Sequence, residues 1–69
     1  MKFRDFLRIL AEHGFELDRQ KGSHRVYKGQ VGGKLYSVVV AVTNEGDDIA
    51  AGTLSAMIRQ SGLPRRTFR

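Results

Sequence analysis

The stretch His24 to Val42, HRVYKGQVGGKLYSVVVAV, decides the fold. Its central pair, Gly32 and Gly33, predicts a β-hairpin, because the two-residue turns that join antiparallel strands need positive φ angles, which glycine adopts freely. With these glycines as the turn, His24 faces Ala41 across the hairpin. The stretch therefore predicts two paired strands and their register.

This register divides the side chains of the hairpin between two faces of the sheet. One face is the better core and carries Arg25, Tyr27, Val38, Val40 and Val42. The other face carries His24, Val26, Lys28, Ser37, Val39 and Ala41. We expect helices to cover the first face, which leaves His24 and Lys28 accessible to a ligand.

Helical periodicity is present on both sides of the hairpin. Residues 3–13 carry apolar side chains at helical spacing, and Gly14 ends this helix with His13 beside it. A histidine at the negative end of a helix dipole needs no catalytic explanation. A second helix is predicted over residues 51–61, ended by Gly62 with Pro64 beyond it.

The remaining segments complete an α+β fold. Alternation of Phe15, Leu17 and Arg19 with polar residues predicts a short strand over residues 15–20 with one buried face. Residues 64–69 have no periodicity and are interpreted as a mobile basic C-terminal tail. The predicted order is helix-strand-strand-strand-helix with an antiparallel three-stranded sheet, the order of double-stranded-RNA-binding domains.

Composition restricts the classes of function. The 69 residues form one domain with a net charge of +5, which is typical of nucleic-acid-binding proteins. There is no cysteine and there are only two histidines, so we expect no metal site and no cofactor. The apolar run Val38 to Val42 is too short to span a membrane, and we expect a cytoplasmic protein without a membrane partner.

The densest polar cluster is the segment from Arg19 to Arg25, RQKGSHR. A histidine can exchange a proton near neutral pH, as RNA cleavage by the 2′-hydroxyl requires, so His24 is the catalytic candidate. The candidate RNA-binding residues are Arg19, Lys21, Gly22, Ser23, Arg25 and Lys28, which offer positive charge, a close backbone approach and a hydroxyl donor. With a single acid/base group in the cluster, composition and spacing alone favour a phosphate-contacting histidine over a catalyst.

Two separated motifs resemble the HicA family of bacterial and archaeal toxins. The first is Arg19 to His24, followed by Tyr27 and Lys28, and the second comprises Gly52 to Leu54 and Ile58 to Leu63. The similarity extends from Lys2 to Leu63, so we expect a single HicA-like domain over residues 1–63, followed by the tail at 64–69.

The resemblance implies a fold similar to double-stranded-RNA-binding domains and a type II toxin. It implies a metal-independent endoribonuclease that cleaves mRNA without the ribosome, with the catalytic histidine at His24 and the characteristic glycine at Gly22. It also implies a HicB-type antitoxin that blocks the active site. Many members carry Pro-His-Pro at the end of the third strand, where this chain has Val40 to Thr43, so a second imidazole is absent there. The run Asn44 to Asp48 is also more acidic than the family's usual lysine-rich loop.

Two other functions remain open from the sequence. The same basic face would serve a non-catalytic RNA-binding module, which holds phosphates without cleaving them. The exposed face with Val26 and Val39 would also serve as a protein-interaction surface, for instance for an antitoxin.

Overall fold

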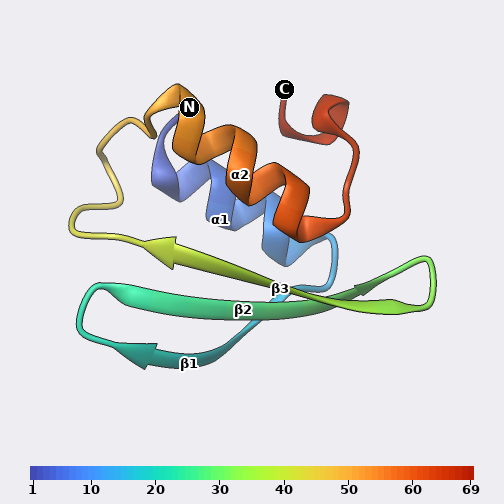
Figure 1. Ribbon diagram of the computed structural model, residues 1–69. Coiled ribbons are helices and arrows are strands. Elements are labelled where there is room, and N and C mark those ends of the chain that lie inside the picture. Colours follow the sequence, from blue (N-terminus) through green and yellow to red (C-terminus); the bar gives the residue numbers. More distant parts are fainter.

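A computed structural model describes all residues, 1–69, and places two helices on one side of an antiparallel sheet (Figure 1). Its elements are α1 (Phe3–Glu12), β1 (Glu16–Lys21), β2 (His24–Val31), β3 (Lys34–Ala41), α2 (Ala51–Ser61) and the 3-10 helix η1 (Arg65–Phe68). The strand order is β1-β2-β3, with both pairs antiparallel. The predicted α+β class and the order of its helices and strands are confirmed.

The β2–β3 hairpin has the register that the sequence predicts. Gly32 and Gly33 form its turn with φ angles of 59° and 82°, and His24 is the cross-strand partner of Ala41. The face of the hairpin opposite His24 packs against the helices, and Val38 on that face is completely buried. The turn therefore fixes which side chains enter the core and which stay on the open face.

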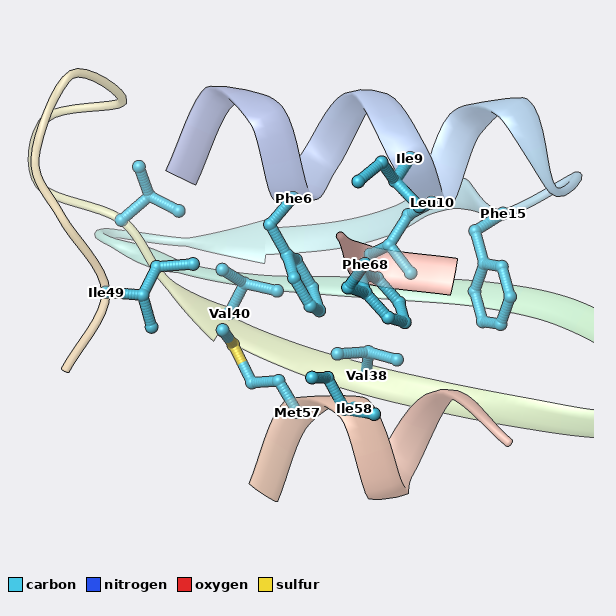
Figure 2. Packing of buried hydrophobic residues seen from close by; sticks show 11 residues of the cluster. Phe6, Ile9, Leu10, Phe15, Val38, Val40, Ile49, Met57, Ile58 and Phe68 are labelled. Atoms are coloured by element: carbon cyan, nitrogen blue, oxygen red, sulfur yellow. The ribbon is translucent and has the colours of Figure 1, made fainter. Parts of the chain in front are cut away.

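The core lies between the sheet and the two helices (Figure 2). It consists of eleven buried hydrophobic residues, namely Phe6, Ile9, Leu10, Phe15, Val38, Val40, Val42, Ile49, Met57, Ile58 and Phe68. Helix α2 also covers the free edge of β3, where the side-chain Oε1 of Gln60 accepts a hydrogen bond from the backbone N–H of Val39 at 3.1 Å. The helical layer is thus tied to β3 by both apolar packing and a polar contact.

Strand β1 lacks the buried face that its alternating sequence predicts. Every one of its residues is exposed, and the side chain of Leu17 remains 50% exposed. The one buried residue of the segment is Phe15, which precedes the strand and packs so closely over Gly29 that a Cβ there would lie 2.6 Å from its ring. Figure 1 shows the reason, because β1 is the edge strand farthest from both helices.

The prediction of a mobile C-terminal tail is wrong, because the tail folds back onto the core. Residues Arg65–Phe68 form η1, and Phe68 is only 6% exposed. Its ring stacks on that of Phe6 with centroids 4.8 Å apart and an interplanar angle of 15° (Figure 2). Burial of an aromatic ring contributes enough free energy to order a short segment that has no periodicity of its own.

The ends of the first helix agree with the sequence. Gly14 has a φ angle of 83°, and the Nδ1 atom of His13 lies 2.8 Å from the carbonyl oxygen of Ile9. His13 therefore serves the end of α1, as its position predicts. Neither α1 nor α2 has the length and apolar composition needed to cross a membrane.

Candidate nucleic-acid interface

The β1–β2 turn positions the predicted catalytic residue. Gly22 and Ser23 form this turn between Lys21 and His24, which are direct cross-strand partners. Gly22 has a φ angle of 58°, a left-handed conformation that glycine adopts without the steric cost of a Cβ. The side-chain Nε2 of Gln20 donates to the Gly22 carbonyl oxygen at 3.1 Å. The turn therefore places the ammonium-bearing and imidazole-bearing side chains on the same face.

The backbone behind His24 is held by the third strand as well. The N–H of Val42 donates to the carbonyl oxygen of Ser23 at 2.8 Å, one residue beyond the end of β3. His24 itself is exposed, and its cross-strand partner on β3 is Ala41, which has a small side chain. The imidazole thus stands on a fixed backbone with an open approach.

A β-bulge decides where Arg19 points. The register between β1 and β2 shifts between Leu17, which pairs with Tyr27, and Arg19, which pairs with Val26. Strict alternation would put Arg19 on the same face as Leu17. The extra residue, Asp18, instead turns Arg19 to the face that carries His24. Nothing in the local sequence marks this bulge.

Asp18 lies among the candidate residues of the open face, and the sequence interpretation missed it. Its Oδ2 lies 3.4 Å from the Nζ of Lys28 and 4.0 Å from an Nη of Arg19. These cations therefore share one carboxylate, whereas Lys21 takes part in none of the ion pairs of the structure. Lys21 is thus the uncompensated positive charge beside His24.

Arg25 does not join this cluster, although it follows His24 in the sequence. It lies on the helix-facing side of β2, where its Nη1 bonds the carboxylate of Glu45 at 2.8 Å and its side chain is 21% exposed. Hydrogen bonding with Glu45, and then with Tyr27, raises the pKa of the Arg25 guanidinium. Its Nε is buried without a partner. Arg25 therefore links β2 to the acidic loop that contains Glu45.

The open face has a mixed apolar and basic character. Val39 is 46% exposed and Leu35 is 64% exposed, and both lie on the face of His24. The second histidine, His13, is at the end of α1 in the other layer. The structure has no pocket and no group of three side chains suited to hold a metal ion. This face therefore brings together cationic side chains and one exposed imidazole.

Comparison with known protein families identifies a family that covers most of the chain. Residues 3–63 match the family described as HicA toxin of bacterial toxin-antitoxin. The matched region begins with α1, ends just beyond α2 and includes the whole β1–β2 turn. No curated protein gives a significant match to the chain.

Proposed function

Given that the chain belongs to the HicA toxin family of bacterial toxin-antitoxin systems, we propose that it is an endoribonuclease that cleaves mRNA. The observation that carries this proposal is the exposed His24 directly opposite the unpaired Lys21. An imidazole beside an uncompensated positive charge can remove a proton from a 2′-hydroxyl while the charge stabilises the adjacent phosphate.

The candidate RNA-binding residues have different roles in the proposed complex. Lys21 neutralises the scissile phosphate, and the turn of Gly22 and Ser23 lets the backbone and a hydroxyl approach its oxygens. Arg19 and Lys28, which share Asp18, contact flanking phosphates. Arg25 was expected to bind RNA from its position in the sequence, but its pairing with Glu45 favours a structural role.

The proposed reaction is an internal transesterification. His24 accepts the proton of the 2′-hydroxyl, a bond forms between the 2′-oxygen and phosphorus, and the bond from phosphorus to the 5′-oxygen breaks. The leaving oxygen receives a proton from water or from the Lys21 ammonium. The products are a 2′,3′-cyclic phosphate and a 5′-hydroxyl. Every proton in this scheme moves without a cofactor or a metal ion.

Membership of a toxin-antitoxin family implies a partner. We propose that this partner is a HicB-type antitoxin that covers the open face. Val26 and Val39 lie in the row next to His24, and Val39 is half exposed. Covering these apolar side chains stabilises a complex and blocks access to the imidazole at the same time.

The test compares two histidines of the same protein. Purified wild-type protein and His24→Ala and His13→Ala variants are incubated with RNA in the presence of a chelator. We expect wild type and His13→Ala to degrade the RNA and His24→Ala to lose at least about a hundredfold in rate. The fold of each variant is checked by circular dichroism. Full activity of a folded His24→Ala variant contradicts the proposal.

A non-catalytic RNA-binding function is the competing proposal, and the presence of one imidazole on the open face favours it. It predicts salt-sensitive binding with no loss of full-length RNA over time. Analysis of the product ends separates the chemistry further. A cyclic phosphate supports attack by the 2′-hydroxyl, whereas a free 3′-hydroxyl points to attack by water.

A further inference from the structure

The positive charge of the chain is concentrated in its last third. Residues 1–48 contain eight Lys and Arg and seven Asp and Glu, a net charge of +1. Residues 49–69 contain four arginines and no acidic residue, a net charge of +4. Most of the net charge of +5 therefore lies outside the β1–β2 turn and its neighbours.

The four arginines are attached to an ordered part of the fold. Phe68 anchors η1 by stacking on Phe6, and the N–H of Thr67 donates to the carbonyl oxygen of Pro64 at 2.9 Å. Because this segment is packed rather than mobile, the backbone that carries its charged side chains has a defined location. A defined set of charges costs less conformational entropy on binding than a flexible tail does.

The arginines share surfaces of α2 and η1. The Nη2 of Arg65 donates to the hydroxyl of Ser55 at 3.0 Å, and Arg59 lies one helical turn after Ser55 on the same side of α2. Arg66 lies within η1 and Arg69 follows directly after it, so both belong to the same C-terminal segment as Arg65. We call this set, Arg59, Arg65, Arg66 and Arg69, the α2–η1 arginine surface.

The chemistry of this surface fits phosphates. None of its members takes part in an ion pair of the structure. A guanidinium group can bind two oxygens of one phosphate at once, through two parallel hydrogen bonds of defined geometry. The exposed large hydrophobic residues, Leu17, Leu35 and Val39, all lie in the sheet, so this surface lacks the apolar centre that a protein interface usually has.

We propose that the α2–η1 arginine surface is a second RNA-binding site that contacts backbone phosphates away from the cleavage position. The proposal rests on the proposed function, in that RNA is the ligand. Figure 1 shows η1 and the β1–β2 turn at opposite ends of the molecule and in different layers. The surface therefore acts on long RNA and leaves the chemistry at His24 unchanged.

The experiment removes three of these charges and keeps Arg65, which bonds Ser55. Binding of a fluorescent thirty-nucleotide RNA is measured in a His24→Ala background, with and without R59Q/R66Q/R69Q, over a series of salt concentrations. The matched control, K2Q/R4Q/K34Q, removes three charges elsewhere that likewise take part in no ion pair. We expect R59Q/R66Q/R69Q to weaken binding at least about tenfold and to lower the salt slope by about two, and the control to do much less. Equal weakening by both sets overturns the proposal.

A second measurement separates this proposal from the ribonuclease itself. With His24 intact, cleavage of a dinucleotide is expected to be the same in wild type and in R59Q/R66Q/R69Q, because so short a substrate cannot reach the arginine surface. If the dinucleotide is cleaved but binding of long RNA is unaffected, the second site is wrong and the ribonuclease stands. If neither substrate is cleaved but R59Q/R66Q/R69Q loses RNA binding, the second site stands and the ribonuclease is wrong. The proposal is also overturned if R59Q/R66Q/R69Q binds RNA as wild type does but loses binding to an acidic protein, because the surface would then be a protein-binding site.

Discussion

Lys21 and His24 face each other directly across the β1–β2 hairpin, with only Gly22 and Ser23 between them. Side chains at directly opposed positions of an antiparallel pair lie within about 5.5 Å at their Cβ atoms. One ligand phosphate can therefore contact both an ammonium group and an imidazole. This geometry depends on the charge of Lys21 and on the backbone of the two-residue turn, and each of these two parts can be tested separately.

The charge of Lys21 is the first part. We expect Lys21→Met to lower kcat/KM for RNA cleavage by about a hundredfold, because the phosphate then gains negative charge in the transition state without compensation. Lys21→Arg is expected to recover most of that loss. An arginine variant as inactive as the methionine variant would instead identify Lys21 as the proton donor. Wild-type activity of Lys21→Met would remove this residue from the site.

The backbone of Gly22 is the second part. Because its φ angle is 58° and no atom lies within 4 Å of an added Cβ, Gly22→Ala meets backbone strain and no collision. We expect Gly22→Ala to lower the free energy of unfolding by about 1 to 2 kcal/mol. Gly22→Asn is the control, since asparagine tolerates this conformation better. Urea unfolding of both variants measures the difference, and equal stability would show that the turn has no such strain.

Arg25 is predicted to act through stability rather than through RNA. We expect Arg25→Gln to reduce the free energy of unfolding by about 1 to 2 kcal/mol, because the substitution removes the ion pair with Glu45. This pair is partly exposed, so solvent screens it only in part. In the His24→Ala background, RNA affinity should remain within about twofold, whereas Lys21→Gln should weaken it. A large loss of affinity in Arg25→Gln would return this residue to the interface.

The pH dependence of this pair follows from the direction of the pKa shift. The folded state raises the pKa of Arg25, so its contribution to stability is complete below the unfolded-state pKa. It is lost only as the pH rises through the raised value. Thermal unfolding of wild type and Arg25→Gln should therefore differ by a constant amount across the neutral range. A difference that changes steeply there would contradict this assignment.

Phe68 should contribute strongly to stability although it lies in the last residues of the chain. We expect Phe68→Ala to cost about 3 kcal/mol, because it removes a buried ring that stacks on Phe6. Phe68→Leu keeps most of the buried volume and should cost less than about 1.5 kcal/mol. Thermal denaturation measures both. A Phe68→Ala variant as stable as wild type would mean that η1 does not pack in solution.

The sequence by itself determined the hairpin, the two helices and the face of His24. Gly32 and Gly33 set the register of β2 and β3, and the register alone put His24 opposite the core face. These features are encoded by neighbouring residues, whose spacing repeats with the period of a strand or a helix. The family resemblance was likewise readable from consecutive residues, and the family match confirms it.

Only the tertiary structure decided the composition of the basic surfaces. The bulge at Asp18 brought Arg19 to the face of His24, Glu45 held Arg25 on the other side, and Phe68 fixed the arginines that follow α2. Each outcome depends on a contact between residues from different elements, or on a register shift that no local period marks. The sequence therefore specified where the imidazole of His24 stands, and packing specified which charges surround it.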